Sequence, residues 1–431
     1  MTDRPWGFRT RALHAGGSPD PTTGARAVPI FQTTSFVFED NADAAALFAL
    51  QKYGNIYSRI GNPTVAALEE RVASLEGGLG AVATGSGQAA EFLVFAALAG
   101  AGDHIVASSA LYGGTVTQLS VTLKRFGVET TFVSGGDPAD FAAAVQDNTK
   151  LIFSEVIANP SNDVADISGL AEVAHAHGVP LVVDATTVTP YLCRPIEHGA
   201  DIVIHSATKF LGGHGTTLGG IIVDAGQFDW GNGRFPHFTE PVSTYGDIRW
   251  WDNFGEYAFL TKVRVEDLRD IGPALSPFNA FLLLQGVETL PQRMREHVAN
   301  ARVVAEWLEA DSRVAWVSYA GLPGHRHAER ARRYTPEGPG AVFAFGIDGG
   351  FAAAEAFIGE VQLLSHLANI GDARSLVIHP ASTTHRQLSA EQRIQAGVPD
   401  DLVRLSIGLE DVDDILWDID QALTVATGRP R

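Results

Sequence analysis

Lys209 is the residue whose type and position point most directly to chemistry. It follows the apolar run Ile202-Val-Ile204 and precedes Gly212 and Gly213. Lysine is usually a solvated surface residue. An ammonium group at the end of a buried strand, however, must be paired or must have a pKa below its reference value of about 10.4. Because a lowered pKa leaves a free amine that attacks aldehydes, we expect Lys209 to form a Schiff base.

Asp184 ends another predicted strand, upstream of Lys209. A carboxylate in this position often only caps a turn, here with Thr186 and Thr187. Beside a lysine one strand away it fits a second role. Pyridoxal phosphate (PLP) withdraws electrons well only when its pyridine nitrogen is protonated, and a buried aspartate keeps it so by ion pairing. The combination of Asp184 and Lys209 therefore predicts a PLP site.

Hydroxyl and glycine residues near these two side chains suit a phosphate group. Ser206 and Thr208 stand beside Lys209 and can donate hydroxyl hydrogens. The run Thr84-Gly-Ser-Gly-Gln88 joins a predicted strand to a predicted helix, whose N-terminus offers free N–H groups to an anion. Many such turns bind no phosphate, and this one is not a Gly-x-Gly-x-x-Gly dinucleotide motif. It supports a phosphate site only together with the lysine and the aspartate.

Aromatic and cationic residues elsewhere are further candidates. Tyr112, before two glycines, is either a core residue or a ring that stacks on a flat heterocycle. Tyr57 and Arg59 suit a phosphate dianion, and because their segment has little core of its own we expect them to serve a neighbouring subunit's site. Arg404, on a late strand, can bind a substrate carboxylate through two N–H groups. The histidines lack metal-ligand spacing, so we predict no metal site.

Short apolar strands that alternate with helices must position these residues. The predicted strands are 81–84, 104–107, 130–133, 151–153, 179–183, 202–204 and 220–223, and the predicted helices are 88–99, 116–126 and 167–177. This alternation predicts an α/β fold with a mostly parallel sheet covered on both faces, which binds ligands outside the carboxyl ends of its strands.

The rest of the chain suggests three parts. Residues 1–60 carry no strong period and are expected to form an arm that reaches a neighbouring subunit. Residues 61–286 form the large PLP-binding domain, and 287–431 a smaller α+β domain with a long helix at 288–310, strands at 314–317, 342–345 and 403–407, and a helix at 352–361. The aromatic-rich segment 228–258 is either a surface excursion packed by its own rings or a cover over a pocket or subunit contact.

The composition is that of a globular protein with a large core. Of 431 residues, 45% are hydrophobic and 19% charged. A formal net charge of -19 disfavours nucleic acid as a partner. Cys193 is the only cysteine, which favours a reducing compartment. With no secretory signal and no apolar run near the roughly 20 residues that cross a bilayer, we expect a cytoplasmic protein without a membrane partner.

Six motifs, in order, resemble the Cys/Met-metabolism PLP enzymes. They are Tyr57-Ser-Arg59 with Asn62-Pro-Thr64, Ser86-Gly-Gln88, Tyr112-Gly-Gly114, Asn159-Pro160, Val183-Asp184 and His205-Ser-Ala-Thr-Lys209. The resemblance extends from Leu13-His-Ala-Gly16 to the segment 403–410. It implies a fold-type I, aspartate-aminotransferase-like subunit that is active as a homotetramer built from dimers.

The resemblance also implies residue roles. Lys209 would bond to PLP, Asp184 would pair with the pyridine nitrogen, and Tyr112 would stack on the ring and assist proton transfer. Asn159 would reach the phenolic oxygen. The implied cofactor-binding residues are Tyr57 and Arg59 of the adjacent subunit with Gly87, Gln88, Tyr112, Asn159, Asp184, Thr186, Ser206, Thr208 and Lys209.

The aromatic segment and the run 276–290 resemble the O-acetylhomoserine sulfhydrylase branch of that family. This implies a γ-replacement that converts O-acetyl-L-homoserine and sulfide, or another thiol, into L-homocysteine and acetate, with Ser375 and Arg404 on the substrate carboxylate. Because Arg374 stands where some lyases carry Glu, cystathionine γ-synthesis, O-succinylhomoserine sulfhydrylation and a methionine γ-lyase reaction stay open. The alternative from another class is a non-catalytic α/β protein that binds a phosphorylated ligand.

Overall fold

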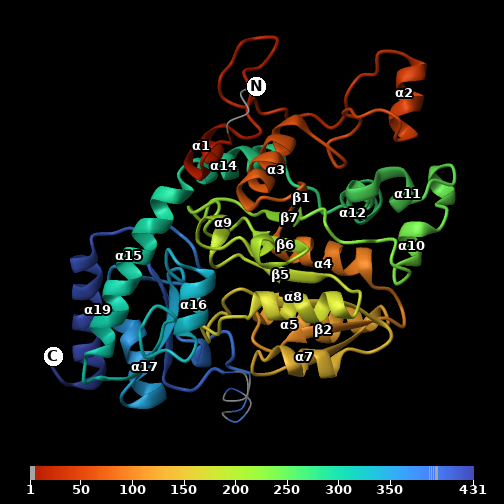
Figure 1. The fold of residues 1–431 in the computed structure, drawn as a ribbon. Helices are drawn as coiled ribbons and strands as arrows, with labels where there is room; N and C mark the ends of the chain where they lie inside the picture. Colours follow the sequence, from red (N-terminus) through yellow and green to blue (C-terminus); the bar gives the residue numbers. More distant parts are fainter. Residues whose placement is uncertain (1–4, 388, 390, 392, 394–396) are drawn as a thin grey trace.

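The computed structural model describes residues 5–387, 389, 391, 393 and 397–431 (Figure 1). Its larger sheet has seven strands. In spatial order they are β1 (Gly80–Thr84), β7 (Gly220–Asp224), β6 (Ile202–Ser206), β5 (Leu181–Asp184), β4 (Thr149–Glu155), β2 (His104–Ser108) and β3 (Glu129–Val133). Only β7 runs antiparallel to its neighbours, so the predicted mostly parallel sheet is confirmed.

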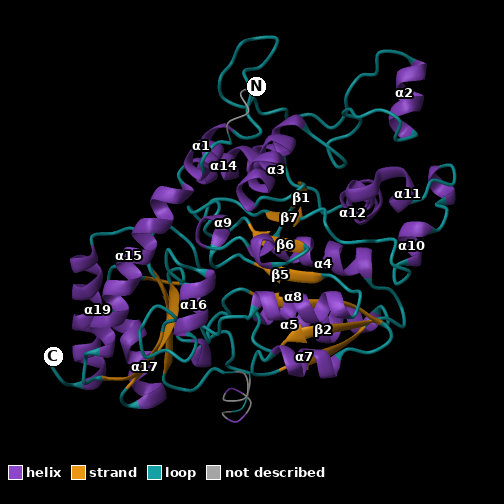
Figure 2. Ribbon diagram, viewed as in Figure 1, coloured by secondary structure: helices purple, strands orange, loops and turns teal. Residues whose placement is uncertain are grey.

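Both faces of this sheet are covered, because alternate side chains of each strand point to opposite faces. On β1, Val82 packs in the apolar cluster that contains α4 (Gly87–Leu98), whereas Ala81 and Ala83 pack in the cluster that contains α3 (Pro63–Glu76) and α8 (Ile167–Ala176). Figure 2 shows the helices on either side of the strands. The two apolar layers hold the carboxyl ends of the six strands other than β7 at one edge.

Helix α4 begins at the edge of the sheet where the phosphate-binding turn was predicted. Ser86 is its N-cap, and the Ser86 side chain accepts a hydrogen bond from the backbone N–H of Ala89. Gly87 and Gln88 form the first turn, whose N–H groups have no acceptor one turn earlier in the helix. The helix therefore presents two backbone donors beside the ends of β1 and β6.

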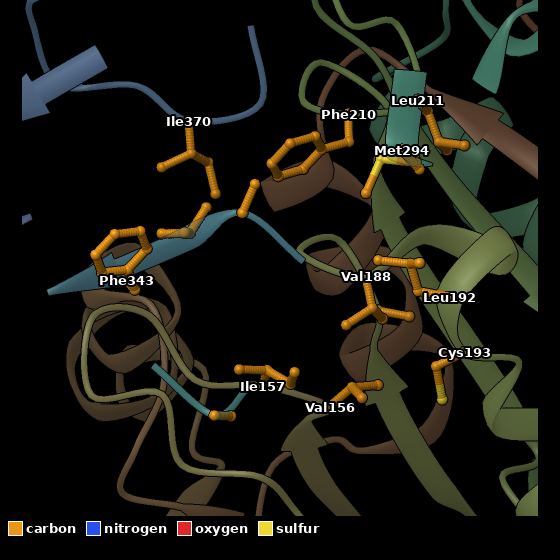
Figure 3. Packing of buried hydrophobic residues seen from close by; sticks show 14 of the residues in the cluster. Val156, Ile157, Val188, Leu192, Cys193, Phe210, Leu211, Met294, Phe343 and Ile370 are labelled. Atoms are coloured by element: carbon orange, nitrogen blue, oxygen red, sulfur yellow. The ribbon is translucent and has the colours of Figure 1, made fainter. Parts of the chain in front are cut away.

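A second, five-stranded sheet forms the C-terminal part. Its order is β10 (Ser365–His366), β11 (Leu376–Ile378), β12 (Leu402–Ser406), β9 (Val342–Ile347) and β8 (Val314–Ser318). The α-helices among the described residues of this part are α15 (Leu290–Glu309), α16 (Ala328–Tyr334), α17 (Gly350–Glu360) and α19 (Val412–Thr427). One apolar cluster continues from the large sheet into this part, and Figure 3 shows Phe210, the residue after Lys209, together with Ile370 and Phe343.

Several elements differ from the sequence-based expectation. The expected helix 116–126 is α5 (Gly113–Thr117), the π-helical η1 (Gln118–Thr122) and α6 (Leu123–Arg125). The expected helix 288–310 is preceded by a separate one, α14 (Pro277–Glu288). The N-terminal segment contains α1 (Phe8–His14) and α2 (Asn41–Phe48). The remaining short elements include α7 (Pro138–Ala144), α9 (Thr189–Leu192), α10 (Pro236–Thr239), α11 (Trp250–Phe254), α12 (Ala258–Lys262), η5 (Val263–Leu268) and α13 (Arg269–Ile271).

The aromatic-rich segment 228–258 is packed by its own rings. Trp230 is 1% exposed and stacks between Phe238 and Phe259, with ring centroids 4.7 and 5.3 Å away. These rings belong to the apolar cluster on the α4 side of the large sheet. None of the described helices is long and apolar enough to cross a membrane. The described residues also include no group of three or more His, Cys, Asp or Glu side chains placed to hold a metal ion.

Candidate active site

A cavity of about 200 Å³ lies at the carboxyl ends of β4, β5 and β6, where the C-terminal part meets the large sheet. Adjacent parallel strands end at one edge, so residues distant in sequence converge there. Ten of the residues predicted from the sequence line this cavity: Gly87, Gln88, Tyr112, Asn159, Asp184, Thr186, Ser206, Thr208, Lys209 and Arg404.

Lys209 follows β6 and faces the C-terminal part of the chain. Its Nζ donates a hydrogen bond to Oδ1 of Asn369 at 2.5 Å. The loop of Asn369 approaches closely because Gly371, at φ +76°, has no side chain; a Cβ there would lie 2.6 Å from the backbone nitrogen of Phe210. Burial, and then the nearby charge of Arg404, lower the pKa of Lys209. Both effects favour the free amine that a nucleophile or base requires.

Asp184 ends β5 and is held by the turn that follows. Its Oδ1 accepts a hydrogen bond from the Thr186 backbone N–H at 2.7 Å, and the Thr186 hydroxyl accepts one from the backbone N–H of Ser206 at 2.8 Å. The carboxyl group is therefore fixed relative to β6. Burial raises the pKa of Asp184 because an unpaired anion is poorly solvated there. A protonated pyridine nitrogen would supply the missing positive charge.

The first turn of α4 and the end of β6 form a cradle for an anion. Side chains are excluded from part of it: a Cβ on Gly87 would lie 2.6 Å from Cβ of Ser206, and a Cβ on Gly220 would lie 2.1 Å from the Ser86 carbonyl oxygen. The hydroxyl groups of Ser206 and Thr208 line the same cavity. Backbone donors at a helix N-terminus and two hydroxyl groups fit the phosphate of PLP.

Arg404, on β12, lines the same cavity. Its Nη2 donates to the carbonyl oxygen of Asn369 at 2.9 Å, and its Nη1 to Oδ1 of Asn159 at 3.5 Å. Burial lowers the pKa of Arg404 to about 10, so the guanidinium keeps its charge at neutral pH. Tyr112 is half exposed, and its backbone N–H donates to Oε1 of Glu155 at 2.5 Å. The wall of the cavity thus includes a cation and an aromatic residue.

Three predicted site residues do not line this cavity. Tyr57 and Arg59 lie outside it, with the Arg59 guanidinium 5.0 Å from the centre of the Tyr57 ring. Ser375 is fully buried, and its hydroxyl donates to Oε2 of Glu410 at 2.9 Å. The side chain of Ser375 is therefore engaged away from the cavity, and its predicted contact with substrate stays a prediction.

Three polar residues of the lining were missed from the sequence: Glu91, Glu155 and Asn369. Glu155 ends β4 as Asp184 ends β5, so its place at the carboxyl edge was a usable signal. Glu91 stands one helical turn after Gly87, on the same face of α4. Asn369 comes from a loop between β10 and β11 that carries no recognisable motif, so nothing in the sequence placed it.

Comparison with known proteins agrees with the site. Residues 9–424 match the model of the Cys/Met metabolism PLP-dependent enzymes. The O-acetyl-L-homoserine sulfhydrylase of Leptospira meyeri is 52% identical over 96% of each chain, and the homocysteine synthase of Schizosaccharomyces pombe is 51% identical over 97% of this chain and 98% of its own.

A solved structure extends the similarity to three dimensions. The putative O-acetylhomoserine (thiol)-lyase of Campylobacter jejuni, whose crystal structure carries a pyridoxyl-lysine monophosphate, is 37% identical to this chain with a TM-score of 0.94. The match covers 97% of this chain and all of that one. The fold-type I subunit and the PLP cofactor expected from the motifs are therefore confirmed. The chain belongs to the Cys/Met metabolism PLP-dependent enzyme family.

Proposed function

We propose that this enzyme replaces the acetate of O-acetyl-L-homoserine with sulfide to give L-homocysteine and acetate. The observation that carries the proposal is the arrangement of Lys209, Asp184 and Arg404 around one cavity, where burial and the charge of Arg404 lower the pKa of Lys209. Relatives about half identical over nearly their whole length are named for this reaction.

PLP, when bound, withdraws electrons from the substrate and so acidifies the hydrogens on Cα and Cβ. Asp184 holds a proton on the pyridine nitrogen. The amine of Lys209 removes the proton at Cα and later moves one at Cβ, while acetate departs from Cγ and sulfide takes its place. With PLP bound, Tyr112 would stack on the ring and stabilise charge near the leaving group, and Asn159 would bind the phenolic oxygen.

Arg404 binds the substrate carboxylate in this proposal. Its guanidinium lines the cavity, and its hydrogen bonds go to neutral oxygens of Asn159 and Asn369. A buried cation with neutral partners favours an anionic ligand. Ser375 is the second predicted contact to that carboxylate.

The active assembly is proposed to be a cytoplasmic homotetramer, arranged as a dimer of dimers, in which residues 1–60 reach a neighbouring subunit. In this division, 61–286 form the PLP domain and 287–431 the small domain. The arm exposes large apolar side chains: Val37 is 100% exposed, Tyr53 86% and Phe48 59%. Exposed apolar groups of this size favour a subunit contact. Tyr57 and Arg59 would then complete the phosphate site of the adjacent subunit.

A panel of donors and thiols tests the reaction. O-acetylhomoserine, O-succinylhomoserine and methionine are each incubated with the holoenzyme, with sulfide, methanethiol, cysteine or no thiol, and products are identified by mass. The proposal expects homocysteine from O-acetylhomoserine with sulfide at the highest kcat/KM. Preference for the succinyl ester would indicate O-succinylhomoserine sulfhydrylation, and cystathionine formed from cysteine would indicate cystathionine γ-synthesis. An α-keto acid formed without thiol would indicate a methionine γ-lyase reaction. Each of these outcomes would replace the proposed reaction. A colourless protein after addition of PLP would instead favour a non-catalytic binding protein.

A further inference from the structure

Glu91 is a buried carboxyl group in the wall of the PLP cavity whose described hydrogen-bond partners are uncharged. It lies in the second turn of α4 and is 3% exposed. Its Oε2 accepts a hydrogen bond from Nε2 of Gln88 at 2.7 Å, and Oγ1 of Thr115 lies 2.9 Å from each carboxyl oxygen. The reaction proposed above assigns no step to this residue.

These contacts join two segments that hold the cofactor on different sides. Gln88 belongs to the first turn of α4, at the phosphate cradle. Thr115 lies in α5, which begins directly after Tyr112. The amide of Gln118 adds a parallel link, because its Nε2 donates to the carbonyl oxygen of Gln88 at 3.0 Å. Glu91 is therefore placed to fix the phosphate-binding turn relative to the ring-stacking tyrosine.

The surroundings of Glu91 disfavour a negative charge on it. The carboxyl groups of Asp184, from β5, and Glu155, from β4, line the same cavity, and the cations of the lining are Lys209 and Arg404. Burial first, and then the charge of Asp184, raise the pKa of Glu91 to about 8. Three buried anions facing one another would each be poorly solvated.

The segment η5, which packs against α4, supplies no compensating charge. Its Arg264 donates to Oε2 of Glu69 at 2.7 Å and to backbone carbonyl oxygens. Lys262, before η5, is paired with Glu266 and Asp267. Both Arg264 and Lys262 therefore already have acidic partners.

We propose that Glu91 works as an uncharged carboxylic acid, a positioning residue that holds Gln88 and Thr115 in place and leaves Asp184 as the single anion for the pyridine nitrogen. As an acid it accepts from Gln88 through one oxygen and shares a hydrogen bond with the Thr115 hydroxyl through the other. The inference rests on the PLP site of the proposed function but not on the choice of acyl donor or thiol.

Two variants separate this role from that of a charged residue. Glu91→Gln keeps the shape, one acceptor and one donor without a charge, and Glu91→Leu keeps the approximate volume without hydrogen bonds. Exposed Glu172, on α8, gives the control Glu172→Gln, and Asp184→Asn shows the effect of removing the proposed counter-ion. Each full-length protein is stripped of PLP and titrated with it, and the visible absorption of bound PLP is followed across pH.

We expect Glu91→Leu to weaken PLP binding about tenfold or more, the loss of roughly one hydrogen bond to a buried group, and Glu91→Gln to rescue the affinity. Below about pH 8 the visible band in Glu91→Gln should follow that of wild type, because the substitution removes no charge there. The infrared difference spectrum, wild type minus Glu91→Gln, should contain the carbonyl stretch of a protonated carboxyl group.

A visible band in Glu91→Gln that departs from that of wild type below about pH 8 would overturn the uncharged assignment. A carboxylate band in place of the carboxyl stretch in the infrared difference would overturn it too. Unchanged PLP affinity in Glu91→Leu would overturn the positioning role. If Glu91→Leu does not fold, the infrared and pH measurements on Glu91→Gln still test whether Glu91 is uncharged. Failure of wild type itself to bind PLP would contradict the proposed function instead, so the two failures are distinguishable.

Discussion

The Nζ of Lys209 donates to Oδ1 of Asn369, and the backbone carbonyl of the same asparagine accepts from Arg404. One loop residue of the C-terminal part thus contacts both cations of the cavity, the proposed base and the proposed carboxylate-binding group. The loop comes close enough because Gly371 packs against the backbone that follows Lys209. The position of this loop therefore sets the separation of amine and guanidinium.

Asn369→Ala should lower kcat about tenfold while PLP still binds. A hydrogen bond to a charged group contributes about 1.5–3 kcal/mol, and part of that loss is recovered by water. Steady-state kinetics with a PLP titration would show it. An unchanged kcat would mean that the contact does not orient the amine during turnover.

Asn369→Asp should displace the acidic limb of the pH profile of kcat toward higher pH. Burial and Arg404 lower the pKa of Lys209, and a new carboxylate 2.5 Å away would raise it. The amine would then lose its proton only at higher pH. An acidic limb that stays in place, or moves toward lower pH, would exclude Lys209 as the group that titrates in the enzyme–substrate complex.

Asp184→Asn should reduce turnover about a hundredfold, or about 2.7 kcal/mol of transition-state stabilisation, and should weaken PLP binding. The amide still accepts from the Thr186 backbone N–H, so the turn is preserved while the charge is removed. Comparison of kcat with the PLP dissociation constant checks this. Turnover near that of wild type would show that the pyridine nitrogen needs no anionic partner here.

The sequence could place the site at the strand ends but not the contacts that come from outside them. Asp184, Ser206 and Lys209 follow apolar strands, and alternation alone predicts that such residues converge. Asn369 depends on how the small sheet docks, which no local pattern encodes. Ser375 shows the converse, since the family resemblance predicts a contact with substrate but its hydroxyl donates to Glu410.

Asp224→Asn should stabilise the protein increasingly as pH rises. Asp224 is buried on β7, its Oδ1 accepts from the backbone N–H of Gly226, and burial raises its pKa to about 7 from 3.8. The protonated Asp224 carboxyl contributes fully to the stability of the fold below about pH 4, and this contribution is lost as pH rises through 7. Asparagine carries no titrating group at this position, so the variant does not lose the contribution.

The measurement is the melting temperature of both proteins at pH 5 and pH 7.5. The variant minus wild-type difference should grow with pH, by at most about 1.4 kcal/mol per unit within the window. Asp229→Asn is the matched control, because exposed Asp229 also accepts a turn N–H, from Gly231. A constant difference for Asp224→Asn would show that this carboxyl is ionised throughout.

Arg59→Ala and Lys209→Ala should each abolish most activity, yet a random mixture of the two subunits should recover about a quarter of it. A site needs Lys209 from one subunit and, in the proposed assembly, Arg59 from its neighbour, so a mixture forms some intact sites. Co-expression with two tags and assay of the purified hybrid checks this. No recovery would place Arg59 outside the neighbouring site.

The most direct test of the central claim is the stoichiometry of products from purified holoenzyme given O-acetyl-L-homoserine and sulfide. Wild type is predicted to release one acetate for each homocysteine formed, and Lys209→Ala to form neither above background. Homocysteine formation by Lys209→Ala at the wild-type rate would contradict the account, as would acetate release by wild type with no homocysteine in the presence of sulfide.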